Sequence, residues 1–148
     1  MRLKRTDKDD PDFITLVHEL NTYLEIADGA DHEFYHQFNG IDNLEAVIVG
    51  YDQTIAVACG AFRIKKMGQV EIKRMYTLPS HRQQGWAGKI LYALEDWARE
   101  LKNHKSVLET GVNQSEAIRL YPKLGYKRIP NFEPYVGVIT SYCFGKKL

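Results

Sequence analysis

The stretch HRQQGWAGKIL, residues 81–91, constrains the fold more than any other part of the sequence. Before it, residues 69–78 are rich in strand-forming side chains, and after it residues 87–101 carry apolar side chains at helical spacing. Such a strand-to-helix turn leaves the first backbone amides of the helix without intrahelical partners. These amides and the positive end of the helix dipole attract anions, and Arg82 and Lys89 can add full charges. The turn therefore predicts a phosphate or pyrophosphate site.

The remaining patterns predict an α+β fold. A helix is expected to begin at Asp10-Pro11, an N-cap followed by a proline at the first helical position, and to end at Asp28-Gly29. The other expected elements are strands over 2–6, 44–51, 54–65, 69–78, 106–111, 126–129 and 141–148, and helices over 31–38, 87–101 and 115–121. This order combines an antiparallel meander with one strand–helix–strand crossover, which is parallel. We expect a mixed central sheet flanked by helices, in a single domain.

Composition restricts the kinds of partner. The 148 residues carry 20 Lys and Arg against 19 Asp and Glu, a net charge of +1, so nothing indicates a nucleic acid or an anionic membrane as partner. Cys59 and Cys143 lie far apart, and no cluster has zinc-ligand spacing, so no metal is expected. The N-terminal residues lack a signal-peptide pattern, and no apolar stretch reaches ~20 residues. A cytoplasmic protein is expected.

Two familiar phosphate-binding motifs do not fit the turn. A P-loop would need glycine at position 83 and Ser or Thr at position 90, where the sequence has Gln83 and Ile90. The dinucleotide motif GxGxxG does not fit the spacing of Gly85 and Gly88. Nucleotide hydrolysis and dinucleotide binding therefore lose their support.

The turn instead resembles the pyrophosphate loop R/Q-x-x-G-x-G/A of the GNAT superfamily of acyl-CoA N-acyltransferases, matched by residues 82–87. The stretch QSEAIRLYPKLGYKRI, residues 114–129, resembles the second signature of that family. The resemblance implies that residues 1–148 form one N-acetyltransferase domain with acetyl-CoA as co-substrate and no metal. It implies direct transfer, in a ternary complex, to an amine of a small molecule or peptide. A non-catalytic acyl-CoA-binding regulatory module is the alternative, and a homodimer is possible.

The resemblance also implies the contacts to the co-substrate. The backbone amides of residues 83–88 would bind the pyrophosphate, and the strand from Met75 to Thr77 would bond the pantetheine arm. Gln114 stands where the family has Asn, so either Asn113 or Gln114 could cap the following helix and bond that arm. The cofactor-binding residues implied are Met75, Tyr76, Thr77, Arg82, Gln83, Gln84, Gly85, Trp86, Ala87, Gly88, Lys89, Asn113, Gln114, Ala117 and Tyr121.

Tyr121 corresponds to the family tyrosine that protonates the departing thiolate. Pro122 follows it directly, and a residue before proline is pushed away from helical geometry, so we expect the helix to end or bend there. A core tyrosine is the alternative interpretation. The attacking amine must also lose a proton, and we expect Glu71 to accept it directly or through water. Glu109, on the next strand, is the rival base.

Strand alternation places Glu71, Lys73 and Met75 on one face unless a bulge intervenes. The carboxylates of Glu71 and Glu109 could equally be structural, in ion pairs with Lys73 or Arg74. The family builds its acceptor pocket from the first two helices and the loop between the last two strands. The candidate acceptor-pocket residues are therefore Tyr23, His32, Phe34, Tyr35, His36, Phe132 and Tyr135.

Overall fold

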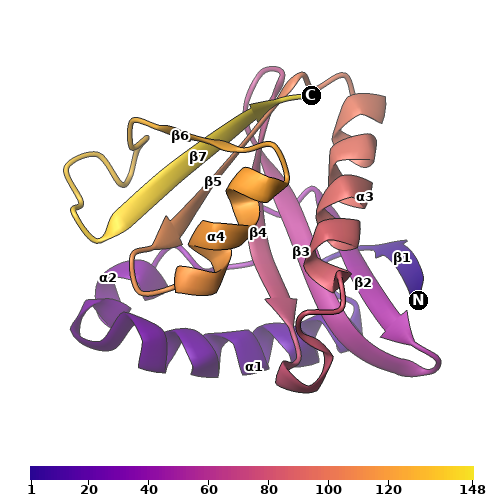
Figure 1. Cartoon of the computed structure of the whole chain (residues 1–148). Coiled ribbons are helices and arrows are strands. Elements are labelled where there is room, and N and C mark those ends of the chain that lie inside the picture. Colours follow the sequence, from indigo (N-terminus) through magenta and orange to yellow (C-terminus); the bar gives the residue numbers. More distant parts are fainter.

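A mixed seven-stranded sheet in the order β1-β2-β3-β4-β5-β7-β6 organises the computed structural model, which describes residues 1–148 (Figure 1). Its strands are β1 (Arg2–Thr6), β2 (Ala46–Asp52), β3 (Ile55–Lys66), β4 (Gln69–Thr77), β5 (Lys105–Gly111), β6 (Lys127–Ile129) and β7 (Ser141–Lys147). The helices are α1 (Pro11–Asp28), α2 (His32–His36), α3 (Trp86–Glu100) and α4 (Ser115–Lys123). Only the β4–β5 pair is parallel. The predicted mixed α+β sheet is confirmed.

Helices cover both faces of the sheet. Helix α1 begins as predicted, because the Asp10 side chain accepts hydrogen bonds from the amides of Asp12 and Phe13. Its apolar stripe packs on one face against Val47 and Val49 of β2. Helix α3 covers the other face, where the largest apolar cluster gathers side chains of α3, β2, β3, β4 and α4. No helix combines the length and the apolar character that a membrane crossing requires.

A β-bulge interrupts β4 at Arg74. Cys59 of β3 pairs with Tyr76, whereas Ala61, two residues further along β3, pairs with Lys73, so β4 carries one extra residue between the two pairs. Arg74 takes the left-handed conformation, with φ 57°. The thiol of Cys59 donates to its carbonyl oxygen at 3.3 Å, which satisfies a backbone group that the bulge frees.

The bulge reverses the side-chain alternation beyond it. Met75 packs toward α3, where a Cβ added at Gly60 would collide with its Sδ and lie 2.8 Å from Ile90 Cγ2. Glu71 and Lys73 precede the bulge and alternate with Ile72, which lies in the cluster under α3. The prediction that Glu71, Lys73 and Met75 share one face applies only to a strand without a bulge, and the extra residue at Arg74 turns Met75 to the other side.

The parallel pair β4–β5 is short. Its register runs only from Gln69 to Glu71 on β4 and from Lys105 to Val107 on β5. Beyond these residues the two strands diverge toward the end of the sheet that α1 crosses (Figure 1). Two hollows of the molecule lie at this gap in the centre of the sheet.

Candidate active site

Two adjoining hollows meet where β4 and β5 diverge. One is an open groove of about 420 Å³ between the β4 end, the loop before α3 and helix α4. The other is a smaller pocket of about 90 Å³ between α1, β4 and β5. Four residues line both: Leu20, Met75, Gln114 and Tyr121. A ligand in the groove and a ligand in the pocket would therefore meet at these side chains.

The loop that enters α3 presents free backbone amides to the groove. The amides of residues 83–88 donate to no backbone carbonyl of the chain. Gln83 and Gly85 take left-handed conformations, with φ 63° and 87°, and Gly85 is the residue before α3. A glycine adopts this conformation without the strain that a Cβ brings. The bare amides predicted from the sequence are thus present, at the N-terminus of a four-turn helix.

Basic and aromatic side chains border these amides. Arg82 Nε donates to the Thr77 carbonyl at 3.0 Å, and its guanidinium lies over the rings of Tyr23 and Tyr76. Arg119 and Lys123 of α4 also line the groove. The sequence analysis missed these two cations. Arg119 and Lys123 are four residues apart, which places both on one side of the helix that carries Tyr121. This spacing could have identified them as groove residues.

Most of the predicted cofactor-binding residues line the groove: Met75, Tyr76, Thr77, Arg82, Gln83, Gly85, Trp86, Ala87, Gly88, Gln114, Ala117 and Tyr121. Gln84 and Lys89 are exposed and do not line it. Asn113 Nδ2 donates to the Ala27 carbonyl at 3.2 Å, and neither Asn113 nor Gln114 caps α4 through its side chain. Trp86 is the first residue of α3, and its ring is buried in the apolar cluster between α3 and the sheet. Only a small part of the residue is therefore available to a ligand.

Tyr121 lies inside α4, which continues through Pro122 to Lys123. The prediction that the helix ends or bends at Tyr121 is therefore wrong in one respect, because the helix continues beyond that residue. Its ring packs against Tyr126 and Phe144, with centroids 5.9 and 6.1 Å away. Burial raises the pKa of its hydroxyl to about 12. Tyr121 is therefore protonated at neutral pH and lies at the junction of the two hollows.

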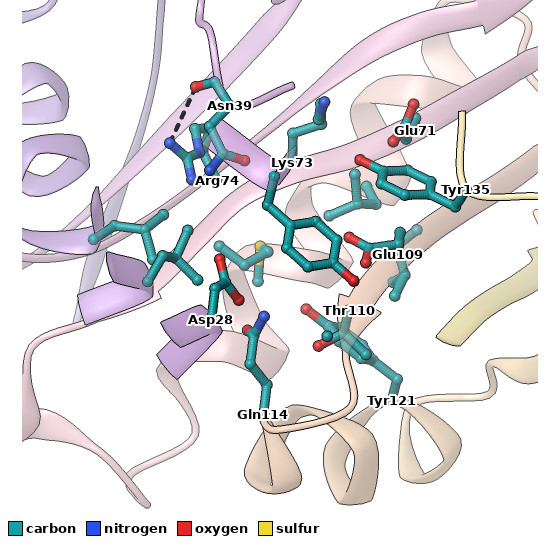
Figure 2. A pocket seen from close by; sticks show the side chains of 17 residues that line it. Asp28, Asn39, Glu71, Lys73, Arg74, Glu109, Thr110, Gln114, Tyr121 and Tyr135 are labelled. Carbon is teal, nitrogen blue, oxygen red and sulfur yellow. Dashed lines mark hydrogen bonds between the residues drawn. The ribbon is translucent and has the colours of Figure 1, made fainter. Parts of the chain in front are cut away.

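The two candidate bases differ in their partners, although both line the smaller pocket (Figure 2). Glu71 is 2% exposed, and its Oε1 accepts a hydrogen bond from Arg63 Nε at 2.9 Å. Lys65 Nζ lies 3.9 Å from the same oxygen. Glu71 is thus held in an ion pair, which occupies one of its oxygens.

Glu109 has no ion pair, and its Oε2 is buried without a hydrogen-bond partner. Burial is the main cause that raises its pKa to about 7. The Ser141 hydroxyl opposes this rise, the negative charges of Asp28 and Glu71 add to it, and Lys73 opposes it least. Glu109 can therefore exchange a proton close to neutral pH, as a general base must.

Two cations also line the smaller pocket. Arg74 Nη1 donates to Asn21 Oδ1 at 2.7 Å and to the Asn39 carbonyl at 3.1 Å, the second bond being drawn in Figure 2. Lys73 Nζ donates to the Phe38 carbonyl at 2.8 Å. Neither side chain forms an ion pair. Burial lowers the pKa of Lys73 and lowers that of Arg74 to about 10.

The predicted acceptor-pocket aromatics divide into three groups. Tyr35 and Tyr135 line the smaller pocket, and the rings of Phe34 and Phe132 pack behind them. Tyr23 lies in the groove instead. The rings of His32 and His36 contact each other in a tilted arrangement, with centroids 5.2 Å apart, and line neither hollow. The structure contains no group of three or more His, Cys, Asp or Glu side chains arranged to hold a metal ion.

Comparison with known proteins agrees with this geometry. The model of the acetyltransferase (GNAT) family matches residues 13–126. A protein of Azospirillum brasilense named IAA acetyltransferase is 32% identical over 125 residues, which are 82% of this chain and 81% of that protein. A crystal structure from Klebsiella pneumoniae that carries the name acyl-CoA N-acyltransferase is 32% identical to this chain. Its TM-score is 0.83, and the comparison covers 99% of this chain and 97% of that chain.

The fold alone is shared with more distant structures. The PaiA N-acetyltransferase of Thermoplasma acidophilum, crystallised with coenzyme A, is 14% identical, with a TM-score of 0.72 over the full length of both chains. The family match covers more than half of the chain, and two relatives above 30% identity are aligned over most of their length. The chain therefore belongs to the GNAT family of acetyltransferases.

Proposed function

We propose that this protein transfers an acetyl group from acetyl-CoA directly to the amine of a small molecule or peptide while both substrates are bound. Family membership supports the acyltransferase activity. The observation that carries direct transfer is the junction of the two hollows, where Tyr121 and Met75 line both. An acyl donor in the groove and an amine in the pocket can react there without a covalent enzyme intermediate.

The groove suits an acyl-CoA. The free amides of residues 83–88 would bind the pyrophosphate, and Arg82, Arg119 and Lys123 would supply positive charge around it. The β4 segment from Met75 to Thr77 has no β5 partner, so it can bond an extended pantetheine arm as an added strand would.

The proton steps follow from the two ionisable groups at the junction. We propose Glu109 as the group that accepts the amine proton, in preference to Glu71, because Arg63 already holds Glu71. The neutral amine then attacks the thioester carbonyl, and strand amides near Met75 and Tyr76 stabilise the oxyanion, an effect worth about 3 kcal/mol per donor. Collapse breaks the carbon–sulfur bond, and Tyr121 gives its proton to the sulfur.

The pH dependence separates the two bases. If Glu109 is the base, kcat/KM rises with pH through about 7, since only ionised Glu109 accepts a proton. This rise of kcat/KM with pH, the acidic limb of the pH profile, should disappear in Glu109→Gln and persist in Glu71→Gln. A limb that instead disappears only in Glu71→Gln would assign the role to Glu71.

Two measurements test the proposal. Thermal denaturation with acetyl-CoA, CoA and ATP shows which ligand the groove takes, since a ligand of the folded state raises its stability. We expect stabilisation by both CoA species and not by ATP. Thiol release from acetyl-CoA with a panel of amines then measures transfer. Stabilisation without thiol release for any amine would identify a non-catalytic acyl-CoA-binding module instead.

A further inference from the structure

The smaller pocket contains buried charges of both signs that have no ionic partner. Arg74 and Asp28 are 7% and 8% exposed. Lys73 and Glu109 are partly buried. All four line the pocket, and none of them forms an ion pair with any other residue. Asp28 is the last residue of α1 and lines the pocket. Its carboxylate also has no hydrogen bond.

Such an arrangement is costly for the empty protein. A buried ion without a counterion loses hydration that hydrogen bonds to neutral groups replace only in part. The charges nevertheless lie within one pocket of about 90 Å³ and do not pair with one another. A ligand that brings a charge of the opposite sign to each group would relieve this cost on binding.

The charges without an ionic partner are separated by sign within the pocket, whereas Glu71, which is paired with Arg63, lies on the same side as Lys73. Figure 2 shows Lys73 and Arg74 beside Asn39, at the end away from Tyr121. In the same view Asp28 lies near Gln114, and Glu109 near Thr110, toward the end where Tyr121 meets the groove. The reacting amine must lie at the Tyr121 end, because Tyr121 borders the groove. A positive group is thus favoured where the amine reacts and a negative group at the opposite end.

We propose that the acceptor is a free amino acid, whose amine lies between Asp28 and Glu109 and whose carboxylate binds Lys73 and Arg74. This inference rests on the proposed function and specifies its substrate class. Arg74 uses only Nη1 for its hydrogen bonds to Asn21 and Asn39, so its other donors are free for a carboxylate.

Two further observations support a small zwitterion. The small volume of the pocket and its walls of Tyr35 and Tyr135 favour a free amino acid over a peptide. Thr110 lines the pocket at 3% exposure, and its hydroxyl oxygen has no hydrogen-bond partner. An ammonium or carboxylate group in the pocket would supply the missing bond.

The first experiment compares matched acceptors at saturating acetyl-CoA. Each amino acid is assayed by thiol release beside its amide and its decarboxylated amine, for example alanine, alaninamide and ethylamine, with rates corrected for the deprotonated fraction of the amine. We expect kcat/KM to be at least ~10-fold higher for the acid, the value of one charge-assisted hydrogen bond. An amide or decarboxylated amine that reacts as well as the acid would overturn the inference while leaving the acetyltransferase activity in place.

A second readout does not depend on turnover. Calorimetric titration of the CoA-saturated protein with the same acids and amides measures acceptor binding directly. If no amine releases thiol, the proposed function fails, and this titration still decides the inference. Binding of amino acids but not of their amides supports it, and failure of every amino acid to bind overturns it.

A variant pair tests the carboxylate contact. Lys73→Gln should raise KM for the amino acid about 10-fold and leave KM for a reactive amide nearly unchanged, because only the acid carries the carboxylate. Lys73→Arg should restore part of the loss. Lys66→Gln, at an exposed and unpaired lysine near the end of β3, is the matched control and should change neither value. An equal change in KM for acid and amide would show that Lys73 has a purely structural role.

Discussion

Replacing Glu109 by glutamine should stabilise the protein at alkaline pH. Burial raises the pKa of Glu109 from 4.5 to about 7. The folded protein therefore binds this proton between those pH values and the unfolded chain does not, so the stability linked to Glu109 is complete below pH 4.5 and is lost as the pH rises through 7. At ~1.4 kcal/mol for each tenfold change in proton affinity, the loss amounts to about 3 kcal/mol at pH 8.

Glutamine keeps the size of the side chain and its hydrogen-bonding oxygen but cannot ionise, so Glu109→Gln avoids this loss. The difference in unfolding free energy between the variant and the parent should be small at pH 4.5 and should grow to about 3 kcal/mol in favour of the variant at pH 8. For a chain of this size that corresponds to roughly 6–12 °C in Tm.

Urea denaturation of both proteins at intervals from pH 4.5 to pH 8 measures this difference. The other ionisable groups are common to both proteins, so their contributions largely cancel, and a constant effect of the substitution appears as an offset that does not vary with pH. A difference that stays flat across the range would refute the reasoning, because it would mean that Glu109 ionises normally in the folded protein. Glu71→Gln is the matched control and should lower stability, since it leaves the Arg63 guanidinium without its counterion.

Three further predictions concern the groove and the sheet beneath it. Tyr121→Phe should lower kcat at least ~10-fold with little change in the Kd for acetyl-CoA, because only the proton donor is lost; an unchanged kcat would remove Tyr121 from the mechanism. Arg82→Gln should weaken CoA binding about 10-fold in a calorimetric titration, whereas Arg99→Gln, at an exposed arginine paired only with Asp96, should not. Gly60→Ala should destabilise the protein by about 1–3 kcal/mol in urea denaturation, because the added Cβ would meet Met75 and Ile90. Gly40→Ala is the control and should be nearly neutral, because a Cβ there meets nothing within 4 Å.

The parts of the fold that the sequence predicted well are those set by local patterns. The cap at Asp10 and Pro11 and the helix end at Asp28-Gly29 are properties of neighbouring residues, and the structure reproduces them. The loop before α3 was also predictable, because free amides and a left-handed residue are consequences of a glycine-containing helix start.

The site charges were harder to predict, because their partners come from distant parts of the chain. Nothing near Glu71 in the sequence shows that Arg63, eight residues earlier, pairs with it across the β3–β4 hairpin and competes with its use as a base. Glu109 is isolated in the sequence and acquires its raised pKa only from burial beside Asp28 and Glu71. The prediction from Pro122 was wrong for a related reason: Tyr121 is helical despite the local preference, and its ring packs against Tyr126 outside the helix.

The bulge at Arg74 explains why one strand can serve both the core and the site. Val70 and Ile72 point into the apolar cluster under α3, so strict alternation would place Arg74 there as well, among Ile90 and Leu94. A guanidinium in that cluster would have no partner and would cost several kcal/mol. The extra residue costs about 1–3 kcal/mol, because a non-glycine residue takes a positive φ. In exchange Met75 fills the space under α3, and Arg74 reaches Asn21, Asn39 and the smaller pocket. The bulge therefore places a cation in the smaller pocket while the core beneath it remains apolar.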